Sequence, residues 1–439
     1  IAARAAFSLA LVGAVVGGFL GMLAGSDGVL GVAFDDFEVA RSFGVIALAF
    51  ILFSGGLSTR WTDIRSVLGP GIALATVGVL VSAVVLGGLA SIILGLPTAE
   101  GMLLGAIIAS TDAAAVFSIL RSRGVSVRGE LGPLLELESG SNDPAAVFLT
   151  VGIIGLIEGT GVGVGGLIGL FFLQMTLGAL AGVVLARAAV WFINRIHLEY
   201  EGLYPVLTIA FVLLCFEGTI LIGGSGFLAA YTAGLTLANR DFLHKRSLLR
   251  FHDAIGWLMQ IAMFVLLGML VFPSDLLPVA GQALAIAALL ILVARPIAVV
   301  ATLLPFRRPI REVGFVSWVG LRGATPIILA TFPVVEGIAN AETIFNVVFF
   351  VVLTSVLVQG TTIPAAARRL GVVDDRTPPE GVRSFDAVIT GDAGHSLREL
   401  TVEDGSAAGG ATIVSLGLPQ GVLAELPQRG DTSVLPPGG

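Results

Sequence analysis

Long apolar runs recur along most of the chain, separated by short stretches that carry Gly, Pro and charged residues. The runs are continuous rather than alternating with a period of two, so they favour helices over the strands of a β-barrel. An α-helix needs about 20 such residues to cross about 30 Å of hydrocarbon. Twelve spans are predicted: 5–25, 43–57, 66–95, 101–119, 133–157, 162–193, 204–222, 225–238, 252–272, 276–304, 312–333 and 343–367.

The polar loops support the same segmentation. One set of alternate loops holds fourteen Lys and Arg residues, whereas the opposite set holds one, Arg41, together with ten acids. An excess of Lys and Arg marks the cytoplasmic side of a membrane protein. Arg4, Arg368 and Arg369, which flank the first and last spans, fall on the basic side. The segment after the last span is therefore expected in the cytoplasm.

Composition agrees with a membrane protein. Of the 439 residues, 56% are hydrophobic and 13% are charged, whereas soluble domains carry about 25% charged residues. The single cysteine, Cys215, excludes an internal disulfide and a Cys-based metal cluster. No basic tract suggests a nucleic-acid partner, and no cofactor is expected. The sequence therefore predicts an all-α polytopic membrane protein embedded in a lipid bilayer.

The composition changes after the last span. Residues 374–439 are rich in Gly, Pro and Asp and contain short β-like pieces such as "ATIVSLGL". The predicted organisation is a transmembrane domain at 1–370, a linker at 371–384 and a cytoplasmic tail at 385–439. The tail ends at "TSVLPPGG" without an obvious closing element, so a truncated domain is expected there.

Several charged residues lie inside the predicted spans, and six of them are candidates for a functional role. They are Asp112, Glu136, Glu138, Asp143, Arg295 and Arg322. Each costs at least about 2.5–3.5 kcal/mol at a helix centre. Such residues face the interior of the bundle or a wet cavity, and by default they mark an ion or proton path.

Three of these six charged residues lie in the segment "LELESGSNDPAAVF". Ser139, Asn142 and Asp143 are spaced i, i+3, i+4 and share one helix face, whereas Glu138 lies about 140° away around the axis. Pro144 has no amide hydrogen, so it frees a carbonyl one turn earlier. By extension from the rules for hard cations, carboxylate, hydroxyl and carbonyl oxygens suit Na⁺ or K⁺.

The other charges have competing interpretations. Arg322 must be paired if it is buried, and Glu138 is the favoured partner because it faces away from the proposed site. Arg295 fits a snorkelling or structural arginine, and Glu136 fits an acid at a helix end in water. Asp112 either belongs to the ion site or is a structural hydrogen-bond acceptor.

The fourth and eleventh spans are both interrupted, at "STDAAA" and "LRGATP". They are seven spans apart, so they run in opposite directions through the bilayer. A pair of interrupted helices at corresponding positions in two halves is typical of the binding site of an inverted-repeat transporter.

Three motifs, in this order, carry a family resemblance: "STDAAAVFSIL", "LESGSNDPAAVFL" and "SWVGLRGATPIILA". They closely resemble the bacterial monovalent cation:proton antiporters, and the nearest branch is the NhaP-type potassium/proton antiporters. "ILFSGGL" and "WLMQIAMFVLLGMLV" resemble that branch too. The similarity spans residues 5–370.

The resemblance implies a set of roles for the motif residues. Thr111 and Asp112 would lie at the unwound crossing of two discontinuous helices. Asp143 would be the ion- and proton-binding carboxylate, with Asn142 beside it, and the monovalent cation would lie at Asp143, Ser139 and Thr111. The structural ion pair would be Glu138 with Arg322. Asn before the key aspartate implies electroneutral exchange of one cation for one proton.

The resemblance also implies an architecture and partners. Members are homodimers of the bacterial inner membrane with thirteen helices and inverted repeats, so the first helix is expected to be missing here. The tail from about 385 resembles the beginning of a TrkA-C-like regulatory domain, which would bind a small ligand.

The predicted function is therefore secondary active antiport, not enzymatic catalysis. A monovalent cation, K⁺ in preference to Na⁺, would be exchanged for H⁺ by alternating access, because both compete for Asp143. A sodium-coupled organic-anion symporter on the same architecture is the alternative, and a passive channel could use the same residues. An intramembrane aspartyl protease is disfavoured because neither "YD" nor "GxGD" frames an aspartate.

Overall fold

The computed structural model describes residues 9–159, 162–196, 198, 200–374, 428–429 and 432–433. The chain divides into two compact units, Ile1–Gly381 and Val382–Gly439. In the second unit the described residues form two short antiparallel strands, β1 (Gln428–Arg429) and β2 (Thr432–Ser433). The rest of the predicted tail, with its expected regulatory domain, lies outside the described residues, as does the start of the first predicted span.

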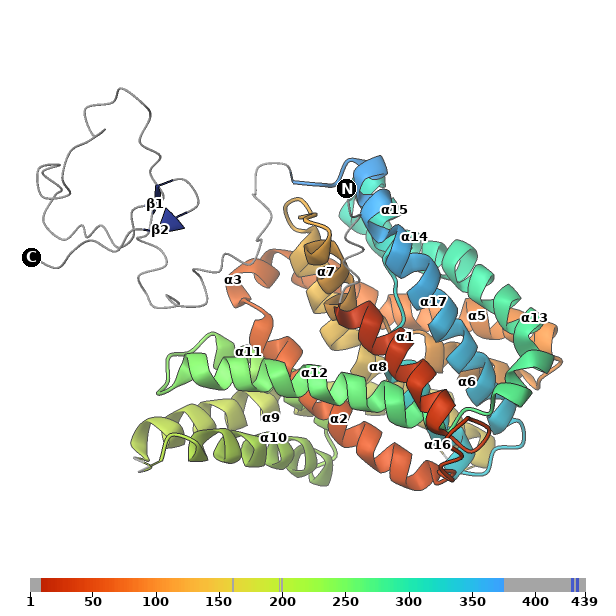
Figure 1. Cartoon of the computed structure of the whole chain (residues 1–439), viewed down its shortest axis with the longest axis horizontal. Coiled ribbons are helices and arrows are strands. Elements are labelled where there is room, and N and C mark those ends of the chain that lie inside the picture. Colours follow the sequence, from red (N-terminus) through yellow and green to blue (C-terminus); the bar gives the residue numbers. More distant parts are fainter. Residues whose placement is uncertain are drawn as a thin grey trace, which may run out of the picture. The chain divides into compact units, whose positions relative to one another are not determined.

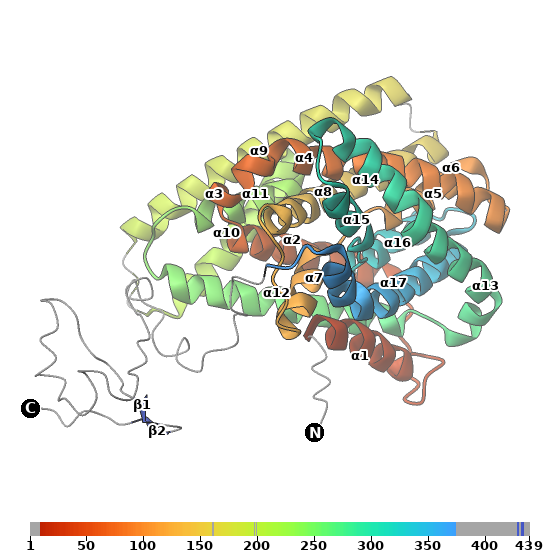
Figure 2. The same ribbon diagram turned by 90° about the horizontal axis from the view of Figure 1, so that it is seen from above.

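The regular elements described in the first unit are all helices (Figures 1 and 2). They are α1 (Leu9–Ala24), α2 (Phe37–Ser58), α3 (Trp61–Ile64), η1 (Arg65–Val67), α4 (Leu68–Ala73), η2 (Leu74–Gly78), α5 (Val79–Leu94), α6 (Thr98–Ile108), α7 (Ala113–Ser122), α8 (Leu131–Glu158), α9 (Val164–Arg195), α10 (Leu203–Leu221), α11 (Gly226–Ala238), α12 (Lys245–Met269), α13 (Pro273–Leu289), η3 (Leu290–Ala294), α14 (Arg295–Leu303), η4 (Leu304–Phe306), α15 (Ile310–Trp318), α16 (Thr325–Val335) and α17 (Ala341–Leu370).

Each predicted span coincides with one helix or with a run of consecutive helices. Within the described residues, eight helices are long and apolar enough to cross a membrane, or nine if the bent pair α6 and α7 counts as one span. The helices α11 and α16 are apolar but shorter. An all-helical membrane protein is therefore confirmed, and the count of twelve spans stays a prediction.

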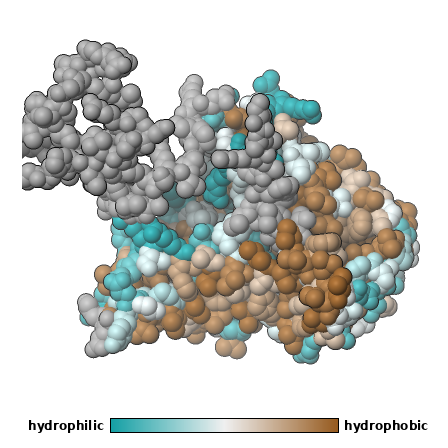
Figure 3. Space-filling view, viewed as in Figure 1, coloured by the Kyte–Doolittle hydropathy of each residue, from teal (hydrophilic) through white to brown (hydrophobic). Residues whose placement is uncertain are grey.

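Apolar side chains cover much of the outer surface of the helical unit. Figure 3 shows them as a broad hydrophobic area over the region where α1, α2 and α12 run in Figure 1. On α9, for example, Phe172, Leu180 and Trp191 are exposed. A soluble protein rarely exposes apolar patches of this extent, so these faces suit contact with lipid tails.

The helices α6 and α7 are separated by a break at residues 109–112 and are bent by 42°. A second break separates α15 from α16 at residues 319–324. The first break ends at Asp112, whose extended backbone and side chain cap α7. The second contains two glycines and ends just before Pro326, which occupies the first turn of α16. These breaks lie at the two interruptions predicted from the sequence.

A second pair of irregularities lies in the preceding spans. The continuous run Trp61–Leu94 contains the π-helical turn η2, and the run Pro273–Phe306 contains the π-helical turn η3. Both runs comprise 34 residues. Irregularities therefore occur in the third and fourth predicted spans and again in the tenth and eleventh.

Close packing between α2 and α11 depends on two glycines. A Cβ atom added at Gly234 would lie 2.1 Å from the carbonyl oxygen of Phe53, and one added at Gly56 would lie 2.2 Å from the carbonyl oxygen of Tyr231. Small residues of this kind let helix backbones approach closely in membranes.

Replacing Gly234 by Ala is expected to lower the free energy of unfolding by about 1–3 kcal/mol, because α2 and α11 must move apart. The measurement is thermal unfolding in detergent. Gly218→Ala on α10 is the matched control, since nothing lies within 4 Å of the added Cβ and Ala favours a helix by about 1 kcal/mol over Gly. Equal melting temperatures for the two variants would contradict the close contact.

Candidate functional site

The two helix breaks meet each other near the middle of the bundle. The backbone amide of Asp112 donates a hydrogen bond to the carbonyl oxygen of Leu321 at 2.8 Å. Gly323 lies against the same residue, and a Cβ there would be 2.4 Å from Asp112 Oδ2. Glycine is therefore required at this position for the two unwound segments to touch.

Arg322 secures the end of α6 within this crossing. Its guanidinium is fully buried, and Nη1 donates to the carbonyl oxygens of Ala109 at 2.9 Å and Ser110 at 2.6 Å. The last carbonyls of a helix have no partner within the helix and carry the negative end of its dipole. The guanidinium cation of Arg322 gives these carbonyls a hydrogen-bond partner, and its charge offsets the negative end of the helix dipole.

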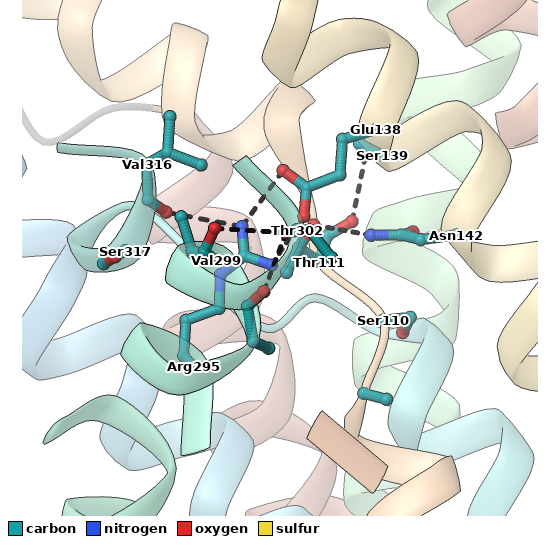
Figure 4. A network of polar contacts seen from close by, with 12 residues as sticks. Ser110, Thr111, Glu138, Ser139, Asn142, Arg295, Val299, Thr302, Val316 and Ser317 are labelled. Atoms are coloured by element: carbon teal, nitrogen blue, oxygen red, sulfur yellow. Dashed lines mark hydrogen bonds and ion pairs between the residues drawn. The ribbon is translucent and has the colours of Figure 1, made fainter. Parts of the chain in front are cut away.

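The polar face of α8 packs against the first break. Ser139 Oγ accepts from the amide of Ala113 at 3.0 Å and donates to the carbonyl oxygen of Thr111 at 2.9 Å. Asn142 Nδ2 donates to Thr111 Oγ1 at 2.6 Å. Figure 4 shows the contacts of Ser139 and Asn142 with Thr111. The sequence-predicted face of Ser139, Asn142 and Asp143 is thus directed at the crossing.

Asp143 lies at the centre of this arrangement and is 7% exposed. Its Oδ2 accepts a hydrogen bond from Thr325 Oγ1 at 3.2 Å, so the first residue of α16, directly after the second break, contributes a hydroxyl. Among the described residues, Asp143 Oδ1, Asn142 Oδ1 and Ser110 Oγ are buried without a hydrogen-bond partner. Unsatisfied buried oxygens are costly. A carboxylate, an amide oxygen and a hydroxyl together suit a proton or a hard monovalent cation.

Asp112 is bound differently from Asp143. Its Oδ1 accepts from the amide of Ala115 at 3.0 Å, and its Oδ2 accepts from Gln260 Nε2 at 3.0 Å. Both carboxylate oxygens are thus engaged with protein donors, which gives Asp112 the capping role of a structural acceptor. Asp112 also lies on the wall of the cavity described below.

The predicted ion pair of Glu138 with Arg322 is wrong, because the structure pairs Glu138 with Arg295. The pair is bidentate: Arg295 Nη1 lies 2.5 Å from Oε1 and Nη2 lies 3.0 Å from Oε2. Both side chains are buried, and Nη2 also donates to the carbonyl oxygen of Val316 (Figure 4). Arg295 on α14 is therefore a structural arginine rather than a snorkelling one. The carbonyls of the first break take the place of Glu138 as partners of Arg322.

A cavity of about 450 Å³ leads to the site. Asp143, Ser110 and Thr325 line its inner part, together with residues of α2, α7, α8, α11 and α12. Arg121 and Asp253, which also line it, are exposed and belong to the side of the basic loops. The cavity therefore connects the buried carboxylate with the end of the bundle that carries these loops.

Three neutral residues of the site were absent from the sequence prediction: Ser110, Thr325 and Gln260. Thr325 and Gln260 reach Asp143 and Asp112 only through the packing of α16 and α12, which helix periodicity does not give. Ser110 and Thr325 lie next to predicted motif residues, so their position was a usable signal. Gln260 is the strongly polar residue of the apolar segment "WLMQIAMFVLL", which was a usable signal too.

Comparison with known proteins places the chain among membrane transport proteins. Residues 6–369 match the family model described as sodium/hydrogen exchanger, transmembrane. The chain is 42% identical to the K(+)/H(+) antiporter NhaP of Alkalimonas amylolytica, over 84% of this chain and 65% of that protein. It is 38% identical to the K(+)/H(+) antiporter NhaP2 of Shewanella baltica, over 95% of this chain and 73% of that protein.

A solved structure is similar over most of the helical unit. The sodium proton antiporter MjNhaP1 from Methanocaldococcus jannaschii superposes with a TM-score of 0.71 at 26% identity, covering 81% of this chain and 91% of that one. The chain spans somewhat less than two thirds of the length of the first relative above.

Proposed function

This chain belongs to the sodium/hydrogen exchanger family, and we propose that it exchanges a monovalent cation for a proton across a membrane, with K⁺ favoured and Na⁺ as the alternative substrate. The resemblance to NhaP-type antiporters inferred from the three motifs is confirmed by the family match and the curated relatives. The family consists of transporters rather than enzymes, in agreement with the sequence prediction.

The observation that carries the proposal is the state of Asp143. It is a buried carboxylate with one unpartnered oxygen, located where two broken helices cross and at the inner end of a cavity. Ionisable residues in this situation mark ion and proton paths in membrane proteins. The neighbouring hydroxyl and amide oxygens supply further ligands without adding charge.

Competition at one carboxylate couples the two fluxes. A proton and a monovalent cation each neutralise Asp143, and each excludes the other. An empty, ionised site carries a charge that is costly to move through the low-dielectric barrier. Only the two loaded forms then alternate between the sides of the membrane.

One titrating carboxylate supports electroneutral exchange. Asn142 beside Asp143 carries no charge, and both oxygens of Asp112 already accept hydrogen bonds from the protein. One cation would therefore replace one proton in each cycle. Of the ligands predicted from the resemblance, Ser139 and Thr111 lie on the cavity wall, and we retain both as cation ligands.

We further propose that alternating access uses inverted repeats. The breaks in the fourth and eleventh predicted spans and the π-helical turns in the third and tenth support this proposal, because each pair lies seven spans apart. The cavity reaches the site from the side of the basic loops, which the positive-inside rule makes the cytoplasmic side. The conformation described here would then be inward-facing.

The remaining assignments rest on the resemblance and stay predictions. They are the location in the bacterial inner membrane with a cytoplasmic tail, the homodimer, and a small regulatory ligand at the tail. The sodium-coupled organic-anion symporter gains no specific support from the described site.

Transport by the purified chain in proteoliposomes with an internal pH dye tests the proposed function. A pulse of external K⁺ is expected to drive protons out of the vesicles, and Na⁺ to do so at higher concentration. Adding the permeant anion thiocyanate should leave the rate unchanged, because electroneutral exchange builds up no membrane potential. No proton movement with K⁺, Na⁺ or Li⁺ would refute antiport, and acceleration by thiocyanate would refute one-for-one exchange.

A further inference from the structure

A second carboxylate lies on the face of α8 that carries Asp143. Glu136, Gly140 and Asp143 are spaced i, i+4, i+7, so they share one face, and all three line the cavity. Seven residues of α-helix separate the two carboxylates by about 10 Å along the axis. Glu136 is on the side of the exposed rim residues Arg121 and Asp253. A cation entering from that side passes Glu136 before it reaches Asp143.

Glu136 has no direct partner in the part of the chain that the structure describes. It is half-buried, and no described residue forms a hydrogen bond or an ion pair within 4.0 Å of it. The charged groups that act on it through space are Arg121 and Asp63, which have opposite signs. A partly desolvated carboxylate without a partner attracts a counter-ion.

Tyr231 on α11 supplies a second oxygen to this part of the cavity. The residue is 2% exposed, and its buried hydroxyl forms no hydrogen bond of normal geometry, although the Thr59 side chain lies close enough to interact with it. Its ring packs directly on Gly140, where an added Cβ would lie 2.1 Å from Cε2. The ring therefore lies over the α8 face between Glu136 and Asp143, and the residue lines the same cavity. A buried hydroxyl without a well-formed hydrogen bond in a native structure requires an explanation.

We propose that the carboxylate of Glu136 and the hydroxyl of Tyr231 form an outer site that holds a monovalent cation on its way to Asp143. One carboxylate and one neutral oxygen suit a weakly held, partly hydrated alkali cation. A divalent ion is disfavoured, since no group of three or more His, Cys, Asp or Glu residues suited to a metal was found in the described ranges. The outer site would raise the local cation concentration next to the inner one.

This inference rests on the proposed exchange for the identity of the cation, so its test has a transport arm and a binding arm. In proteoliposomes, Glu136→Gln is expected to raise the apparent KM for K⁺ about fivefold, the effect of losing one partly exposed charge contact. The maximal rate should be retained, because Asp143 is untouched. Tyr231→Phe should raise KM in the same direction by about twofold.

The matched control is Asp241→Asn. Asp241 lies in the basic loop between α11 and α12, is fully exposed, and lies outside the cavity lining. The Asp241→Asn substitution removes one negative charge from the same side of the membrane as Glu136→Gln does. Its effect on KM therefore measures the general electrostatic attraction of cations to that side. An unchanged KM in this variant with a raised KM in Glu136→Gln supports a local site. Equal shifts in both variants would overturn it.

The binding arm uses the Asp143→Asn chain in detergent, in which the inner site has lost its charge. Broadening of the ²³Na⁺ resonance by this protein is expected to persist, to disappear when Glu136→Gln is added, and to remain with Asp241→Asn. If the ²³Na⁺ resonance is broadened but the parent chain shows no cation:proton exchange, the outer site is supported and the proposed function is refuted. Exchange with a KM unaffected by Glu136→Gln, together with broadening that survives it, would refute the outer site alone.

Discussion

Replacing Asp143 by Asn is expected to abolish cation:proton exchange while the protein remains folded. The amide keeps the size of the side chain and can still accept from the Thr325 hydroxyl, but it neither takes up a proton nor neutralises a cation. Loss of a proton-transferring group lowers rates by about 100-fold or more. The measurement is the initial rate of K⁺-driven proton movement in proteoliposomes containing equal amounts of each protein.

Stability provides the control for this variant. Asp143 is buried with one oxygen unpartnered, so removing its charge removes a desolvation cost. The melting temperature in detergent should therefore stay the same or rise. Asp112→Asn is the companion variant, because both carboxylate oxygens of Asp112 already accept hydrogen bonds, one from Ala115 and one from Gln260. Full exchange in Asp143→Asn, with loss of exchange in Asp112→Asn, would move the ion site to the other aspartate.

The face of α8 could be predicted from the sequence because helix periodicity alone fixes it. The spacing of Ser139, Asn142 and Asp143 brings them to one side, and Glu138 to another, whatever the tertiary structure. The two breaks were equally visible, since polar and small residues interrupt otherwise apolar spans. The resemblance of the motifs to a known family then implied the roles of these residues, which residue spacing alone does not give.

The partner of Glu138 could not be predicted in the same way. Arg295 and Arg322 are both candidate partners inside the spans, and charge balance does not decide between them. The choice depends on how α14 and the second break pack around α8, which is tertiary information. A buried arginine also does not have to pair with a carboxylate, since Arg322 is bound to the carbonyl oxygens of Ala109 and Ser110. A helix break frees backbone carbonyl oxygens to accept hydrogen bonds, and these acceptors are not visible when only the side chains of the sequence are considered.

Breaking the buried pair of Glu138 and Arg295 is expected to cost about 3–5 kcal/mol of unfolding free energy, because either single change leaves an uncompensated charge. Glu138→Gln keeps one acceptor oxygen for Arg295, beside the carbonyl oxygen of Val316, but leaves the buried guanidinium charge uncompensated. Arg295→Gln leaves a 1% exposed carboxylate. The double variant removes both charges and lets two amides meet, so it should be more stable than either single variant.

A double-mutant cycle separates this pair from the alternative one. Glu138 and Arg295 should show a coupling of about 2–3 kcal/mol, the upper range for residues in direct contact. Glu138 and Arg322 should show a coupling of only about 0.5 kcal/mol, because no direct contact joins them and Arg322 is bound by backbone carbonyls instead. Thermal and denaturant unfolding in detergent would measure both cycles, with Arg322→Gln as the third single variant. A larger coupling of Glu138 to Arg322 than to Arg295 would contradict the pairing and restore the one expected from the sequence.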